Sequence, residues 1–290
     1  MKPAPFEYVV ASSAAEASRL LRDLGEDAKI LAGGQSLIPM LNFRLVQPQY
    51  IIDINPVSEL DYIRVTDSAL VVGARTRTAS IEGSTEVRRS VPLLTEAVSF
   101  IGHPSIRHRG TLGGSIAHAD SSSELPTVAV ALDAEIVVRN VDRERTFRGV
   151  DFFKGTFTTA RDDDELVIEV RFPRWPEDSG FAFMEFSRRH GDFAVAGVAA
   201  MLTLAGGRIT RAALALCGVG TTPVRAVEAE RLLLGEVPSV AVARAAGQAA
   251  TAGLHPSSDI HGSGTFRRQV AMAYVERAIL RAAERAGVRA

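Results

Sequence analysis

Apolar residues in the first third of the chain alternate between helical spacing and short β-branched runs. Residues 16–24 carry Ala and Leu at helical intervals with charges between them, and Gly25 is a suitable end for a helix. Residues 29–34 predict a short buried strand that ends in two glycines. The segments PQYIIDI and ALVVGA predict two more strands, which loops rather than long crossovers connect.

The middle of the chain continues this mixture and ends in a linker. Residues 91–102 predict a helix closed by glycine, and residues 125–140 predict a helix that runs into a strand. A further strand over residues 165–173 ends at a proline. Two prolines, acidic residues and a glycine fill residues 173–180, so we place a domain boundary there, between residues 176 and 177.

Residues 195–220 predict two long strands joined at Gly206-Gly207, which is a hairpin signal. Helical spacing of Ala and Leu begins after Pro223 and resumes, after a break, over residues 265–286. The chain is therefore expected to be an α+β protein. Residues 1–176 form its first domain, and residues 177–290 form a smaller domain of an antiparallel sheet with helices.

The amino-acid composition and net charge of the chain limit the classes of binding partner and cofactor that it can have. The chain has 290 residues, of which 46% are hydrophobic and 23% charged, and its formal net charge is −1, so no broad field attracts nucleic acid or an anionic membrane. No apolar run approaches the roughly 20 residues of a membrane span, and a cytoplasmic location is expected. Cys217 is the only cysteine, which excludes internal disulfides and cysteine-held clusters, so redox chemistry here needs a borrowed cofactor.

Two glycine pairs are the main chemical signal. Gly33-Gly34 lies in KILAGGQSLI, and Gly113-Gly114 lies in RGTLGGSIAHAD, and hydroxyl residues follow both pairs. Without a Cβ atom, such a backbone can take positive φ and bring N–H groups close to a phosphate. Neither segment is a G-x-G-x-x-G fingerprint or a P-loop, and each pair read alone could be a tight turn. The spacing thus predicts a phosphate-bearing ligand without naming it.

Three segments together, AGGQSLIPMLNFRL, IRHRGTLGGSIAHADSSSELP and RRHGDFAVAGVA, resemble the FAD-binding medium subunit of molybdenum hydroxylases, the family of xanthine dehydrogenase and aerobic carbon monoxide dehydrogenase. The resemblance covers nearly the whole chain. It implies a FAD-binding domain of the vanillyl-alcohol-oxidase (PCMH) type, made of two α/β subdomains that divide near residues 55–60. A C-terminal domain of the carbon monoxide dehydrogenase flavoprotein type follows.

The same resemblance implies that both glycine loops hold the FAD diphosphate and that Asp192 and Phe193 lie near the isoalloxazine. Ser115 and Glu124 depart from common family forms, which have Asn or Asp at the first position and Asp at the second. No residue of this chain is expected to be catalytic or to bind a metal. The cofactor-binding residues implied are Lys29, Ile30, Leu31, Ala32, Gly33, Gly34, Gln35, Ser36, Leu37, Ile101, Thr111, Gly113, Gly114, Ser115, Ala119, Glu124, Leu166, Asp192 and Phe193.

Several residues also have a simpler interpretation. Histidines 103, 108 and 118 cluster at the second glycine loop, but their spacing matches no common metal site, so hydrogen bonds to backbone or cofactor are expected. Periodicity alone favours Phe193 as a core residue at the start of a strand, but its position in the segment that carries the family resemblance reverses this expectation. The acidic run at residues 162–165 is most simply a solvated turn, and Cys217 lies in an apolar strand pattern typical of a buried small side chain.

The resemblance implies an oxidoreductase subunit that transfers electrons. A large subunit with a molybdenum cofactor oxidises the substrate, a small subunit relays electrons through two [2Fe–2S] clusters, and FAD on this chain passes them to an external acceptor. A heterotrimer or its dimer is expected. Two alternatives stay open: a self-contained FAD-dependent oxidase, and a structural subunit with a decayed flavin site. The substrate and the acceptor are not implied.

Overall fold

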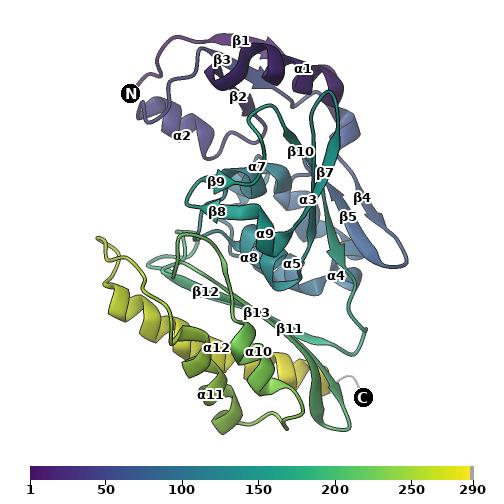
Figure 1. Cartoon of the computed structure of the whole chain (residues 1–290), viewed down its shortest axis with the longest axis vertical. Coiled ribbons are helices and arrows are strands. Elements are labelled where there is room, and N and C mark those ends of the chain that lie inside the picture. The colour runs from purple at the N-terminus through teal and green to yellow at the C-terminus, as the bar shows by residue number, and fades with distance from the viewer. Residues whose placement is uncertain (288–290) are drawn as a thin grey trace.

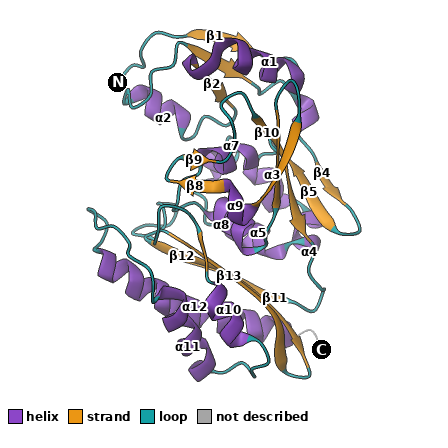
Figure 2. Cartoon of the chain, viewed as in Figure 1, coloured by secondary structure: helices purple, strands orange, loops and turns teal. Residues whose placement is uncertain are grey.

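Three sheets follow one another from the N-terminal to the C-terminal part of the molecule (Figure 1). The computed structural model describes residues 1–287. In the view of Figure 2, a three-stranded sheet lies at the top, a five-stranded sheet in the middle and a four-stranded sheet at the bottom. Helices separate the lower two sheets, and no helix within residues 1–287 is long and apolar enough to cross a membrane.

The N-terminal sheet is parallel, with β3 between β1 and β2. Its first helix begins where Ser13 accepts a hydrogen bond from the Glu16 N–H, which confirms the helix predicted over residues 16–24. Strand β2 ends at Leu31, before the glycines, and is only partly buried. The elements are β1 (Glu7–Val10), α1 (Ala14–Leu24), the 3₁₀ turn η1 (Gly25–Asp27), β2 (Ala28–Leu31), α2 (Leu37–Asn42), β3 (Tyr50–Asp53) and the 3₁₀ turn η2 (Ser58–Leu60).

The middle sheet is antiparallel, in the order β4-β5-β10-β6-β7. Its strands are β4 (Ile63–Val65), β5 (Ala69–Gly73), β6 (Glu135–Arg139), β7 (Glu144–Arg148) and β10 (Leu166–Pro173), with a separate hairpin of β8 (Phe153–Gly155) and β9 (Thr158–Thr159). The helices are α3 (Thr78–Gly83), α4 (Thr85–Ser90), α5 (Pro92–Val98), α6 (Pro104–Arg107), α7 (Leu112–His118), α8 (Glu124–Ala131) and α9 (Gly149–Phe152).

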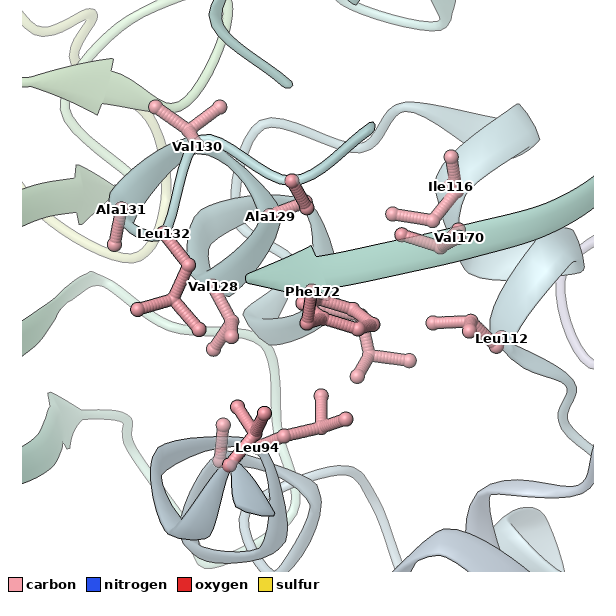
Figure 3. Close-up of a cluster of buried hydrophobic side chains, with 14 of the residues drawn as sticks. Leu94, Leu112, Ile116, Val128, Ala129, Val130, Ala131, Leu132, Val170 and Phe172 are labelled. Atoms are coloured by element: carbon pink, nitrogen blue, oxygen red, sulfur yellow. The ribbon is translucent and has the colours of Figure 1, made fainter. Parts of the chain in front are cut away.

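Helices α5, α7 and α8 pack with β10 into one core, whose gathered side chains are shown in Figure 3. Phe172 of β10 is fully buried in this core, and every residue of α8 is buried. The helix predicted over residues 91–102 is shorter than expected. It begins at Pro92, which suits the first turn because it lacks an N–H, and it ends at Val98.

The C-terminal sheet is antiparallel and buried on both faces. Along β12, Val198, Ala200 and Leu202 pack against the last three helices, whereas Ala199 and Met201 join the core formed with α5 and α8. Gly206 and Gly207 take φ of +56° and +75°, which confirms the predicted hairpin. The elements are β11 (Gly180–Phe186), β12 (Ala196–Ala205), β13 (Arg208–Cys217), β14 (Val224–Arg225), α10 (Val227–Leu233), α11 (Val240–Thr251) and α12 (Gly264–Gly287).

A charged contact ties this sheet to the middle of the molecule. Arg285 of α12 donates through Nη1 to Glu96 Oε2 of α5 at 2.7 Å and through Nη2 to Oε1 at 3.1 Å. Its Nη1 also donates to the Phe181 carbonyl at 2.7 Å. A bidentate ion pair therefore holds residues 96 and 285 together. Bidentate pairs between arginine and a carboxylate are stronger than pairs with a single hydrogen bond.

We predict that Gly180→Ala destabilises the protein. A Cβ atom at Gly180 would lie 1.8 Å from the Ala282 carbonyl oxygen, so β11 and α12 would have to move apart. The expected loss in the free energy of unfolding is about 3 kcal/mol, measured by urea denaturation. Gly253→Ala is the matched control, since nothing lies within 4 Å of its Cβ position. Equal effects of the two substitutions would contradict this packing argument.

Candidate functional site

A cavity of about 560 Å³ lies among the three sheets, within the range of about 300–1,000 Å³ that is usual for small-molecule sites. All residues of the predicted cofactor-binding set line it except Leu31 and Ala119. Leu31 is the last residue of β2, and its Cδ1 lies 3.1 Å from the Cβ position of Gly34, so it packs beneath the loop. Ala119 is 1% exposed and forms the left-handed end of α7.

The first glycine loop presents free N–H groups. Within residues 1–287, the N–H groups of residues 33–36 donate to no acceptor, while Gln35 Nε2 donates to the Gly33 carbonyl at 3.2 Å. Gly34 has φ of +73°, a conformation that favours glycine. Helix α2 has only six residues, so these amides rather than a helix dipole carry the positive potential. Unpaired consecutive amides in a half-buried loop suit an anion.

The second glycine loop is different, because the N–H groups of residues 112–115 are already used inside the protein. Leu112 N–H donates to the Thr76 carbonyl at 3.1 Å, and Gly113 N–H donates to the Ala74 carbonyl at 2.8 Å. Thr111 caps α7 by accepting from the Gly114 N–H at 3.1 Å. This loop therefore offers the cavity its shape and the Ser115 hydroxyl rather than a row of amides.

The glycines also allow segments to touch. A Cβ atom at Gly33 would lie 2.5 Å from the Arg109 carbonyl oxygen, and one at Gly113 would lie 2.5 Å from Ala74 Cβ. The first pair therefore lies directly on the segment that leads into the second loop, and the second pair lies against the end of β5. The tight-turn interpretation accounts for neither contact.

Asn55 and Arg77, which the sequence analysis missed, join the two loops; we call this pair the loop clasp. Asn55 Nδ2 donates to the Ala32 carbonyl of the first loop at 2.9 Å, and Arg77 Nη2 donates to Asn55 Oδ1 at 2.5 Å. Arg77 Nη1 donates to the Arg109 carbonyl, which precedes the second loop. Burial lowers the pKa of Arg77, and Arg109 beside it acts in the same direction.

A signal for Asn55 was present in the sequence. Asn55 follows β3 just as the first glycine pair follows the parallel neighbour β2, and the carboxyl ends of parallel strands share one edge where ligands bind. Arg77 carries no comparable signal, because its partners lie 22 and 32 positions away along the chain.

Aromatic side chains form another part of the cavity lining. Phe193 is 62% exposed, so its interpretation as a core residue is wrong, and its neighbour Asp192 is exposed beside it. Phe157, between β8 and β9, also lines the cavity and stacks on His118 with ring centroids 4.7 Å apart. Phe157 has φ of +57°, which is uncommon for a residue other than glycine, and no sequence pattern singled it out.

Ionisable groups near the cavity have strongly altered pKa values. Burial raises the pKa of Glu124, the first residue of α8, to about 7, and that of Glu185 to about 9. Burial lowers the pKa of His118. Glu165 is buried and pairs with Arg145 at 2.5 Å, so only part of the acidic run is a solvated turn. Among residues 1–287, no group of three or more His, Cys, Asp or Glu residues could hold a metal ion.

Two family models together cover most of the chain. The model described as "FAD binding domain in molybdopterin dehydrogenase" matches residues 4–175, and the model described as "CO dehydrogenase flavoprotein C-terminal domain" matches residues 181–282. The chain belongs to the FAD-binding medium subunits of molybdenum hydroxylases. It is accordingly an oxidoreductase subunit, and its cofactor is FAD.

Individual relatives support this family over the full length. The 6-hydroxypseudooxynicotine dehydrogenase complex subunit alpha of Paenarthrobacter nicotinovorans is 45% identical over 287 residues, which are 99% of this chain and 97% of that protein. The carbon monoxide dehydrogenase medium chain of Hydrogenophaga pseudoflava is 37% identical over 279 residues, 96% and 97% of the two chains. A solved carbon monoxide dehydrogenase from the same organism, which lacks the Mo-pyranopterin moiety, matches with a TM-score of 0.96 at 38% identity and covers 98% of this chain and 99% of that chain.

The comparisons confirm the predicted family, the α+β fold class and the cofactor. The cavity of this FAD subunit fits that cofactor, because a diphosphate is anionic and the first loop offers unpaired amides. The exposed aromatic residues that line the cavity, Phe157 and Phe193, suit a flat ring.

We predict that Asn55→Ala and Arg77→Met each weaken FAD binding at least tenfold, because the two glycine loops lose their hydrogen-bonded connection to each other. The double variant should lose little more than either single variant, since the residues act as one unit. Affinity is measured by titrating the FAD-free chain with FAD and following flavin fluorescence. Arg64→Met, at an exposed arginine of β4, is the control. Unchanged FAD affinity in both clasp variants would show that the clasp serves stability alone.

We predict that Glu124→Gln stabilises the FAD-free chain at pH 8. In the folded state the Glu124 carboxyl has a pKa of about 7, whereas its ordinary pKa is 4.5. The folded state therefore binds a proton that the unfolded state has lost, and the free energy of unfolding of the wild type falls as pH rises from about 4.5 to 7. The glutamine side chain does not titrate, so the variant does not lose this stability. Its advantage in the free energy of unfolding is on the order of 3 kcal/mol at pH 8 and vanishes below pH 4.5. Urea denaturation across this range, with exposed Glu236→Gln as control, measures it. A difference that does not vary with pH would contradict the burial argument.

Proposed function

We propose that this chain receives electrons from [2Fe–2S] clusters of a small partner subunit and passes them through FAD to an external acceptor. In this proposal the substrate is oxidised on a large partner subunit that holds the molybdenum cofactor. The observation that carries the proposal is that one cavity is lined both by the first loop, whose N–H groups are free, and by the exposed Phe193. Bound FAD supplies the ability to take up electrons one at a time and to release them singly or in pairs.

The chain's own residues bind and orient the cofactor. In this proposal the amides of the first loop hold the diphosphate, and the loop clasp keeps the second loop against the first. Phe193 lies against the ring and limits the approach of water and of unsuitable acceptors. The proposed cofactor-binding set is the one that the sequence predicts, with Leu31 and Ala119 supporting the cavity from behind, together with Asn55, Arg77 and Phe157.

Partners and domains belong to the same proposal. The two curated relatives described above are named for different substrates, 6-hydroxypseudooxynicotine and carbon monoxide, although both resemble this chain over nearly its whole length. We therefore assign the choice of substrate to the large subunit. The proposed assembly is a heterotrimer or its dimer. Residues 1–176 are proposed as the FAD-binding domain and residues 177–290 as the domain that contributes Phe193.

The experiment compares the chain purified alone with the chain co-expressed with its genomic neighbours. We expect about one FAD per chain in both samples, released by heat and identified by chromatography. A panel of aldehydes and N-heterocycles, added without oxygen, should bleach the flavin only in the co-purified complex. Gly33→Ala should abolish FAD binding because its Cβ would lie 2.5 Å from the Arg109 carbonyl, whereas Gly83→Ala, with open space around it, should not.

The other outcomes decide between the alternatives. Bleaching by a substrate in the isolated chain would establish a self-contained oxidase instead of an electron relay. Absence of FAD from both samples, even after FAD is added, would overturn the proposal in favour of a structural subunit.

A further inference from the structure

The segment DIHGSGTFRRQ, residues 259–269, does not line the cavity. Its first part, residues 259–263, forms a turn, and the rest is the start of α12. Asp259 Oδ1 accepts hydrogen bonds from the His261 N–H at 2.8 Å and the Gly262 N–H at 3.2 Å. The Asp259 N–H donates to the Gly262 carbonyl at 3.1 Å. In Figure 1 this turn lies at the free end of the yellow-green α12, away from the C-terminus.

Arg267 connects this turn to two other segments. Its Nη2 donates to Asp259 Oδ2 at 2.7 Å, and its Nη1 donates to the carbonyls of Val195 at 2.8 Å and Gly218 at 3.2 Å. Arg267 is 6% exposed, and its hydrogen bond to Asp259 lowers the pKa of that carboxyl to about 2. One buried side chain therefore binds the turn, the start of β12 and the end of β13 together.

Stability alone does not explain why the charged side chain of Arg267 is buried here. Arg267 Nε is buried and finds no acceptor within residues 1–287, and the partner carboxylate of Asp259 is 45% exposed. Burying a charge with an unsatisfied N–H costs free energy that an apolar side chain would not cost. A role in positioning the segments that Arg267 hydrogen-bonds explains why its charge is buried.

Both segments lead to walls of the cavity. Val195 lies two positions after Phe193, and Gly191, two positions before it, lies on the Gly102 carbonyl, where a Cβ atom would approach to 2.9 Å. Asp192 and Phe193 thus form a short projection fixed at both ends. On the other side, the Gly218 N–H donates to the Ser121 carbonyl at 2.9 Å, close to the start of α8.

We propose that Arg267 is a positioning residue for Phe193: through the Val195 carbonyl it fixes the C-terminal end of the projection that carries this ring, and Asp259 holds the guanidinium in place. The ring's position relative to bound FAD then depends on a residue outside the cavity. This inference rests on the proposed placement of Phe193 beside the flavin.

The first test uses the FAD-free chain. Hydrogen exchange followed by mass spectrometry should show residues 187–196 exchanging at least tenfold faster in Arg267→Met than in wild type, with β5 unchanged. Arg268→Met is the matched control, because Arg268 is the exposed neighbour whose side chain makes no ion pair or hydrogen bond within residues 1–287. Unchanged exchange at residues 187–196 in folded Arg267→Met would overturn the proposal. If that variant does not fold, Asp259→Asn replaces it, with a smaller increase expected at the same residues and the same overturning result.

The second test measures the visible circular dichroism of bound FAD. With FAD bound, Arg267→Met should alter the visible circular dichroism in the same direction as Phe193→Leu, and the double variant should add nothing to Phe193→Leu. Additive effects would overturn the proposal, because Arg267 would then act by another route. A spectrum unchanged by Phe193→Leu would overturn it as well while leaving FAD binding intact. Failure of the wild-type chain to bind FAD would instead overturn the proposed function.

Discussion

The cavity depends on one close contact between backbones, that of Gly33 with the Arg109 carbonyl. The first glycine loop follows β2 of the N-terminal sheet, whereas Gly113 and Gly114 lie in the first turn of α7, which packs on β10 of the middle sheet, and the two sheets share no strand. Only a residue without a side chain lets the two segments meet at Gly33, and Arg77 of the loop clasp donates to the same Arg109 carbonyl. The loops could otherwise each fold well and still be too far apart to act on one ligand, so this contact converts two local turns into a single site.

The C-terminal sheet completes the site because both of its faces are buried. One face packs on its own helices and the other on α5 and α8, and the ion pair between Glu96 and Arg285 reinforces that second contact. The β11–β12 connection thereby lines a cavity whose other lining residues come from the N-terminal and middle parts of the fold. The glycine loops and the residues around Phe193 therefore belong to different parts of the fold and can vary separately.

Local features were predictable from the sequence, and long-range ones were not. Helix α1, the glycine hairpin and the end of β10 at Pro173 follow from capping, turn chemistry and proline, which act over a few residues. The identity of the cofactor was predictable from sequence motifs and not from hydrophobic periodicity. The loop clasp, the stacking of Phe157 on His118 and the internal use of the second loop's amides all depend on residues that only the tertiary fold brings together.

The lone thiol has a practical consequence. Cys217 is 0% exposed at the end of β13, and burial raises its pKa, so almost no thiolate forms at neutral pH. This FAD-binding oxidoreductase subunit thus presents no reactive thiol of its own. The native chain can also carry a single engineered surface cysteine for a spin label or fluorophore without removal of the natural one, which opens distance measurements across the assembled complex.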